Sequence, residues 1–240
     1  MARFARLYRT SIGAKSVMAV TGLLLFLFLI GHLAGNSLIF KGRDAINSYA
    51  QGLKNLGPLL WVIRIGLLAV FLAHVATAIK LGAANKEARP MPYAKEDTVQ
   101  ATWMSRYMML TGMVVLAFVV YHLLHFTFHQ FGPRGTFHQF GPRGQMVEIL
   151  ADGTTRTDVY GMVVAGFKSP LITISYVVAH IFLLLHLLHG VSSLGQTLGW
   201  NHETVTPLVR KGLPAIAVLI VVGKLCIPLS ILLGIIGGDA

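Results

Sequence analysis

The chain has 240 residues, of which 55% are hydrophobic and only 12% are charged. Soluble domains carry about 25% charged residues, so this composition excludes an ordinary soluble domain. A formal net charge of +11 could indicate a nucleic-acid-binding protein. The basic residues, however, lie at the edges of long apolar segments, where they are typical of membrane topology. We therefore expect a membrane protein, in contact with lipid and without a nucleic-acid partner.

Five apolar segments are long enough to cross a bilayer, which requires about 20 residues for a hydrocarbon core of about 30 Å. In chain order they are Val17–Phe40, Leu59–Leu81, Tyr107–Phe128, Leu171–Leu194 and Leu213–Ile236. Only short tails and loops remain. We therefore predict an all-α membrane protein with five transmembrane helices, a single domain over residues 1–240, and a longest loop over residues 129–170.

The distribution of basic residues predicts the orientation of the chain. The first apolar segment is too long for a cleaved signal peptide, and no small-residue cleavage site follows it. Eleven basic residues lie on the side of the N-terminus and eight on the opposite side. The positive-inside rule then places the N-terminus in the cytoplasm and the 129–170 loop outside. We expect a multi-pass protein of the cell's inner (cytoplasmic) membrane.

The fifth segment contains two residues that could be functional groups. Lys224 lies well inside this apolar segment, and we expect it to face a partner protein or lipid headgroups. Cys226 is the only cysteine, so this chain alone forms no internal disulfide and binds no iron–sulfur cluster. We expect Cys226 to be a helix-packing residue.

The predicted outer loop contains a perfect tandem repeat. Residues 127–135 and 136–144 both read TFHQFGPRG. The unit is too short and too rich in glycine and proline to be a folding repeat. We expect its histidines, His129 and His138, to be loop residues without a ligand role.

The remaining chemistry lies in the histidines. Seven of the ten lie within or at the edge of an apolar segment: His32, His74, His122, His125, His180, His186 and His189. Ionisable residues at membrane depth are costly and usually functional. A single such histidine can equally be a packing residue that hydrogen-bonds a neighbouring carbonyl. Taken together, these histidines favour a functional site, because each of the first four segments carries a suitable histidine.

One histidine in each of these four segments lies 15 residues after the start of its segment. They are His32, His74, His122 and His186. Fifteen residues correspond to roughly 22 Å of helix. Because consecutive helices run in opposite directions, the first and third histidines share an outer level, and the second and fourth share an inner level roughly 15 Å away. Two imidazole pairs at two depths predict a bundle of the first four helices that holds two bis-histidine haems.

Alternatives stay open at this point. Zinc transport sites and proton relays usually use carboxylates, and the apolar segments contain none. A transporter whose histidines are structural or bind substrate ions is nevertheless a possible reading. His125 and His189 each follow a candidate ligand by three residues, so either could replace it. His180 lies on a different helix face and is expected to pack or to meet a haem propionate, and His202 is expected in a surface loop.

Several motifs resemble one known family. Thr10–Gly22 reads TSIGAKSVMAVTG and leads into GHLAGNSLIFKGRDAINSYAQGL. Later segments read DVYGMVVAGFKSP and LLLHLLHGVSSLGQTLG. These motifs resemble the single-chain cytochrome b subunit of succinate dehydrogenase and fumarate reductase, the b558-type dihaem membrane anchor. The resemblance extends from Ser11 to Gly234, and the duplicated TFHQFGPRG is not part of the family pattern.

The resemblance implies a function and a set of ligands. Such an anchor docks a flavoprotein subunit and an iron–sulfur subunit at the cytoplasmic face, and electrons pass through two haems b between the iron–sulfur subunit and a membrane quinone, menaquinone or ubiquinone. It assigns His32 and His122 to the iron of the outer haem and His74 and His186 to that of the inner haem. Residues 83–105, residues 197–211 and the N-terminal tail are expected to form the docking surface. The alternative within this class is the anchor of another membrane dehydrogenase.

Two further groups of residues are candidates for binding. Contacts with haem propionates or with an inner quinone are expected from Lys15, Ser16, Lys80 and Arg106. Quinone reduction and quinol oxidation move protons, and the apolar segments contain no carboxylate. We therefore expect a loop residue to transfer the proton. We expect Asp44, in the segment KGRDAINSY, to serve an outer quinone site, with Ser11 and Lys15 as the inner alternative.

Overall fold

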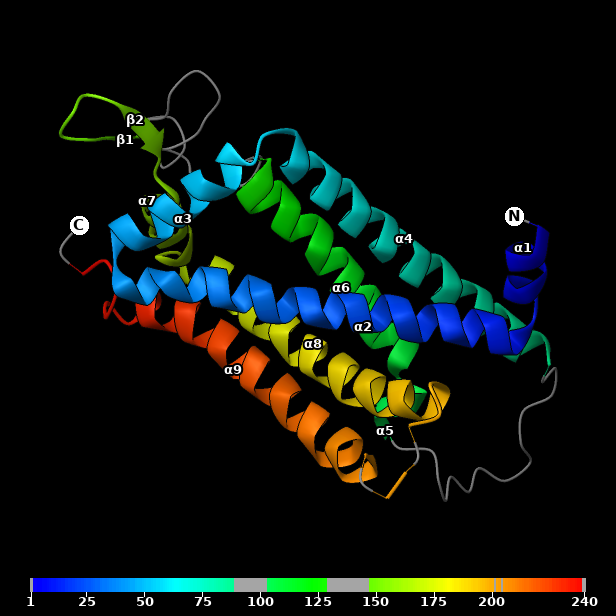
Figure 1. Ribbon diagram of the computed structural model, residues 1–240. Coiled ribbons are helices and arrows are strands. Elements are labelled where there is room, and N and C mark those ends of the chain that lie inside the picture. The colour runs from blue at the N-terminus through cyan, green and yellow to red at the C-terminus, as the bar shows by residue number, and fades with distance from the viewer. Residues whose placement is uncertain (1, 89–102, 129–146, 201, 204, 239–240) are drawn as a thin grey trace. The chain divides into compact units, whose positions relative to one another are not determined.

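The computed structural model describes residues 2–88, 103–128, 147–200, 202–203 and 205–238 (Figure 1). A short helix, α1 (Ala2–Arg9), turns directly into the first long helix, α2 (Ser11–Asn36). The turn requires glycine at position 13, because a Cβ atom there would lie 2.1 Å from the carbonyl oxygen of Leu7. Thr10 caps α2 by accepting a hydrogen bond from the backbone N–H of Gly13 at 3.0 Å.

Among the described residues, five helical stretches are long and apolar enough to cross a membrane. They are α2 with the short helix η1 (Ser37–Lys41), α4 (Pro58–Glu87), α6 (Met108–His122) with the π-helical turn η2 (Leu123–Thr127), α8 (Pro170–Thr197), and the π-helical turn η3 (Leu208–Gly212) with α9 (Leu213–Leu232). The described chain also contains three shorter helices and one hairpin: α3 (Arg43–Asn55), α5 (Trp103–Arg106), α7 (Val159–Phe167) and β1–β2 (Val147–Ile149, Thr155–Thr157). The chain is a multi-pass membrane protein of helical fold.

The five predicted spans are confirmed, with changed ends. The first and second helices extend beyond the apolar segments, because a helix continues through the polar interface as long as its backbone bonds are satisfied. The fourth begins at Pro170, where a missing N–H has no cost. The predicted end of the fifth span at Ile236 is wrong. That helix ends at Leu232, because Gly234 adopts a left-handed conformation with φ of +74°.

The outer surfaces of the spans are apolar. In the apolar window of α4 no residue is buried, and Trp61, Val62 and Leu72 are all largely exposed. A soluble protein rarely exposes a continuous apolar surface of this size. Such faces are suited to contact with lipid.

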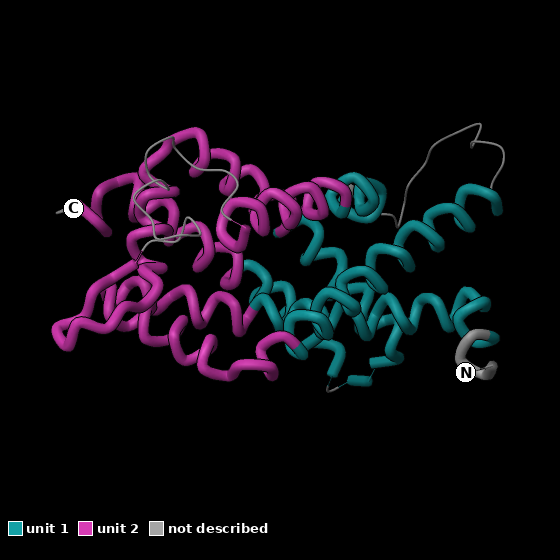
Figure 2. The backbone as a smooth tube through the Cα atoms, turned by 90° about the horizontal axis from the view of Figure 1, so that it is seen from above, with its two compact units in different colours: residues 1–29, 62–112, 184–218 teal, residues 30–61, 113–183, 219–240 magenta. Residues whose placement is uncertain are grey.

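Packing divides the chain into two compact units, and each span contributes to both (Figure 2). Unit 1 comprises residues 1–29, 62–112 and 184–218. Unit 2 comprises residues 30–61, 113–183 and 219–240. An apolar core lies in unit 2, and Ile39, Phe167, Tyr176 and Ile231 are among its buried side chains.

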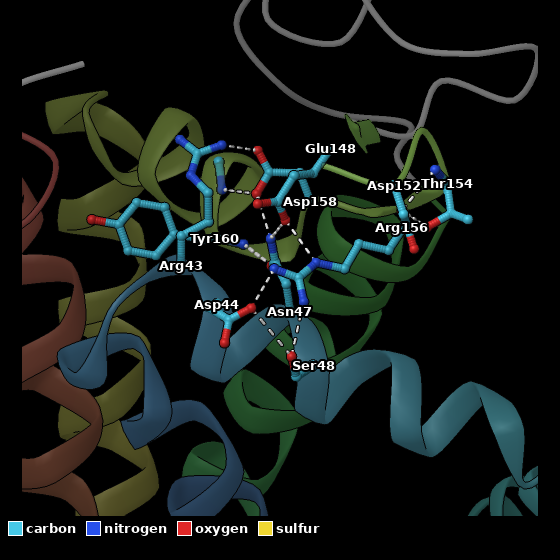
Figure 3. Close-up of polar contacts among 11 residues, drawn as sticks. Arg43, Asp44, Asn47, Ser48, Glu148, Asp152, Thr154, Arg156, Asp158 and Tyr160 are labelled. Carbon is cyan, nitrogen blue, oxygen red and sulfur yellow. Dashed lines mark hydrogen bonds and ion pairs between the residues drawn. The ribbon is translucent and has the colours of Figure 1, made fainter. Parts of the chain in front are cut away.

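A polar cluster in unit 2 joins α3, the hairpin and α7 outside the spans (Figure 3). Fully buried Asn47 donates to Asp158 at 2.9 Å and to Glu148 at 2.8 Å, and it accepts from the backbone N–H of Tyr160. Asp158 caps α7, and its carboxylate forms an ion pair with the Arg43 guanidinium at 2.6 Å. We call this cluster, which also includes Asp44 and Arg156, the polar clasp.

Arg156 supplies the second cation of the polar clasp. Its guanidinium contacts Glu148 and Asp44, each at 2.8 Å. Hydrogen bonds from Arg156 and Asn47 hold the pKa of Glu148 below its ordinary value. The clasp is therefore an internally paired network that ties the loop after the first span to the loop before the fourth.

Candidate functional site

The structure brings His74 of α4 and His186 of α8 together in unit 1. Their ring centroids lie 6.4 Å apart and their planes are inclined by 70°. A glycine faces each ring: a Cβ atom on Gly22 or on Gly112 would lie 3.3 Å from Cε1 of His74 or of His186, respectively. Both rings therefore lie where the neighbouring helix carries no side chain.

Hydroxyl groups fix the orientation of both rings in this α4–α8 pair. Thr21 lies 3.1 Å from Nδ1 of His74, and Thr111 lies 3.3 Å from Nδ1 of His186. Each hydroxyl donates its own proton to a backbone carbonyl of its helix, that of Val17 or of Met108. A hydroxyl has only one proton, so each threonine oxygen accepts from Nδ1–H of its histidine. The lone pair of each ring is consequently at Nε2, which is free to bind a metal.

The second histidine pair lies in unit 2. His32 of α2 and His122 at the end of α6 have ring centroids 5.8 Å apart and planes inclined by 70°. This α2–α6 pair has the same mutual geometry as the α4–α8 pair, but the groups around it are different. Tyr176 of α8 lies 3.2 Å from Nδ1 of His122.

Lys224 belongs to this second pair, contrary to our expectation that it faces a partner or lipid. Its Nζ lies 2.9 Å from Nδ1 of His32, and Nδ2 of Asn36 lies 2.9 Å from the same nitrogen. Asn36 also donates to the carbonyl of His32, so its amide nitrogen is the group that faces the ring. Both neighbours are donors, which makes Nδ1 of His32 an acceptor. The sequence feature that could have predicted this contact is a charged residue inside an apolar segment, because such residues are rare and usually functional.

The alternative ligands have other contacts. His125 is fully buried in the π-helical turn η2, with Nδ1 3.1 Å from the Tyr176 hydroxyl. His189 hydrogen-bonds Ser193 on its own helix at 3.1 Å. His180 is paired through Nδ1 with the carbonyl of Tyr176 at 2.7 Å, as expected of a packing histidine.

The remaining predicted residues lie apart from the histidine pairs or outside the described chain. Lys80 contacts the carbonyl of Tyr8 and lies over its ring, Ser16 bonds the carbonyl of Ile12, and Lys15 and Arg106 are exposed. Asp44 is 88% exposed and paired with Arg156. His202 lines an open hollow of about 540 Å³ with Arg210 and Lys211. His129 and His138 lie outside the described residues.

The spacing of both pairs fits a flat metal complex between the rings. Two imidazoles that bind one metal ion from opposite sides, with bonds of about 2 Å, have ring centroids roughly 6.3 Å apart. The observed 6.4 Å and 5.8 Å bracket this value. Among the described residues no group of three or more His, Cys, Asp or Glu could hold an ion by itself. Two axial nitrogens suit a haem, whose macrocycle supplies the other ligands.

The two sites differ in the groups that face Nδ1 of their histidines. In the α4–α8 pair a threonine hydroxyl faces Nδ1 of each ring. In the α2–α6 pair Nζ of Lys224 and Nδ2 of Asn36 face Nδ1 of His32, and the same Asn36 nitrogen lies 3.4 Å from Nε2.

Comparison of the chain with protein families, with curated proteins and with solved structures found no match.

Proposed function

We propose that the chain is the membrane-anchor cytochrome b of a succinate:quinone oxidoreductase, which binds two haems b and the membrane quinone. The observation that carries this proposal is the presence of two histidine pairs, one on the first and third spans and one on the second and fourth, each with the spacing of axial ligands. The family resemblance of the sequence supports the choice of a flavoprotein and an iron–sulfur subunit as partners. When bound, the haems supply one-electron redox centres.

In this proposal His74 and His186 hold the inner haem, nearest the iron–sulfur subunit, and His32 and His122 hold the outer haem. Thr21 and Thr111 orient the inner ligands, and the apolar spans exclude water from both sites. The cytoplasmic N-terminal tail and the loops at residues 83–105 and 197–211 form the docking surface. Asp44 exchanges a proton with quinone at the outer face.

The test is purification of the chain from membranes with its bound subunits. We expect a red protein with two b-type haems per chain, a flavin-containing partner and a cysteine-rich partner. Cross-links from the docking loops should join the cysteine-rich partner, whereas cross-links only from the loop at residues 130–168 would reverse the orientation. A colourless protein would favour the transporter alternative. Haem with other partners would favour the anchor of a different dehydrogenase.

Replacing Thr21 with valine is expected to raise the midpoint potential of the inner haem and leave that of the outer haem unchanged. The Thr21 oxygen accepts Nδ1–H of His74, and such a bond increases the electron donation of the ring to iron. Without it the oxidised form is less stable, and we expect a shift of tens of millivolts, roughly a threefold to tenfold change in the ratio of reduced to oxidised haem. Potentiometric titration of both haems measures it. Thr77→Val is the control, because among the described residues the Thr77 hydroxyl bonds Ala73 and Tyr8 and neither histidine pair. An equal shift in Thr77→Val would contradict the assignment.

Replacing Asp44 with asparagine is expected to slow quinone turnover severalfold while both haems stay bound. The substitution removes a proton-accepting carboxylate and keeps its shape. Asp44 is 88% exposed, so water screens its pair with Arg156 and folding should be retained. Asp152→Asn, at an exposed hairpin residue that bonds Thr154, is the matched control. Unchanged turnover in Asp44→Asn would remove Asp44 from the mechanism.

A further inference from the structure

Tyr176 contacts both His122, the proposed ligand of the outer haem iron, and His125, which the proposed function does not assign to iron. The residue is 3% exposed and belongs to the apolar core of unit 2. Its hydroxyl lies 3.2 Å from Nδ1 of His122 and 3.1 Å from Nδ1 of His125. One hydroxyl on α8 therefore contacts the two consecutive histidines of the sequence YHLLHF.

A phenol hydroxyl has a single proton, so it can donate to only one of these nitrogens. Its oxygen can accept from the other. The hydroxyl makes both hydrogen bonds, one as donor and one as acceptor, when one histidine carries its proton at Nδ1 and the other carries it at Nε2. The histidine with Nδ1–H is the one that presents a free lone pair at Nε2, and that nitrogen can bind a metal.

The surroundings of the two rings differ. His122 faces His32 at a centroid distance of 5.8 Å. His125 belongs to the π-helical turn, which rotates it away from the spacing of a regular helix. Its Cε1 and Nε2 both lie 3.3 Å from the position of a Cβ atom on Gly166 of α7, and Tyr121 stacks on its ring at 5.7 Å. The Nε2 edge of His125 thus faces α7.

We propose that Tyr176 is a positioning residue for the outer haem: it accepts a hydrogen bond from Nδ1–H of His122 and donates one to Nδ1 of His125. This relay selects His122 rather than His125 as the iron ligand and fixes the orientation of its ring. In this arrangement buried His125 accepts a hydrogen bond from Tyr176. A residue of α8 thus determines which of the two histidines binds iron. The proposal rests on the proposed haem function.

The test compares Tyr176→Phe with Tyr121→Phe. The Tyr121→Phe control also removes a tyrosine hydroxyl, from a residue whose ring packs against His125 and Tyr176. Loss of the acceptor at Nδ1–H of His122 reduces electron donation to iron. At the wild-type midpoint potential of the outer haem, the ratio of reduced to oxidised outer haem should rise threefold to tenfold in Tyr176→Phe, and tenfold corresponds to about 59 mV for one electron. The inner haem should not shift. Low-temperature electron paramagnetic resonance should show an altered signal from the outer haem alone.

Further outcomes decide between this role and simpler ones. Loss of only the outer haem in Tyr176→Phe, with the inner haem retained and Tyr121→Phe unaffected, also supports positioning. An unchanged outer potential, an equal shift in Tyr121→Phe, or a shift of both haems overturns the proposal. His125→Gln, which keeps an acceptor for the Tyr176 proton, should retain both haems; retention in His122→Gln with loss in His125→Gln would reverse the ligand assignment. A wild-type protein without haem would instead refute the proposed function.

Discussion

Replacing His74 or His186 with alanine is expected to lower the haem content of the chain from two to one. Each haem in the proposed arrangement takes one ligand from each of two spans, and the two pairs share no residue. A missing axial ligand leaves five-coordinate iron that is held more weakly. The α2–α6 pair lies in a different compact unit, so its haem should remain.

The two classes of ligand variant should also differ in electron transfer. Variants of His74 or His186 should not pass electrons from the dehydrogenase subunits to the outer haem, because the inner haem comes first on the path. Variants of His32 or His122 should still reduce the inner haem. Haem stoichiometry, low-temperature spectra and redox titration measure these effects.

His189→Ala is the matched control, since His189 lies one turn from His186 and bonds Ser193. Joint replacement of His129 and His138 should also leave the spectra unchanged. The scheme fails if His32→Ala and His74→Ala abolish the same redox component, or if the wild-type chain binds a single haem.

Replacing Asp158 with alanine is expected to destabilise unit 2 by about 2–4 kcal/mol, the combined cost of a lost helix N-cap and of a buried hydrogen-bond donor left without one acceptor. Its carboxylate caps α7 and accepts from Arg43 and Asn47, and its side chain is only 8% exposed. The substitution leaves the fully buried amide of Asn47 without one acceptor and also removes the helix cap.

Thermal unfolding in detergent, followed by circular dichroism, measures this loss. Asp152→Ala is the control, because Asp152 is an exposed hairpin residue that bonds Thr154 in the same turn. We expect the unfolding temperature of Asp152→Ala to stay near that of the wild type. Equal unfolding temperatures for Asp158→Ala and the wild type would show that the polar clasp adds nothing to the stability of the fold.

The sequence by itself determined the class of protein and the number of spans. A bilayer imposes about 20 apolar residues on each crossing helix, and this requirement is visible in composition alone. The level of each histidine followed from counting residues, because helix rise is constant. The structure brings His32 near His122 and His74 near His186, as that count expected, and their binding of iron stays a prediction.

Only the tertiary structure decided which polar groups meet these histidines. Lys224 lies 192 residues from His32 in the sequence, and Tyr176 lies 54 from His122. The side chain of a residue on another span meets a histidine only if that helix has the right rotation about its axis, and an apolar segment with no polar face carries no information about its rotation.

The polar clasp and the end of α9 were likewise decided by packing. Asn47 and Asp158 read as ordinary loop residues, and they become a buried pair only when α3 and α7 come together. α9 ends before the apolar run ends, because the backbone at Gly234 turns into a left-handed conformation that apolar composition does not predict. Composition thus determines what enters the membrane, whereas helix rotation and loop packing determine which side chains touch.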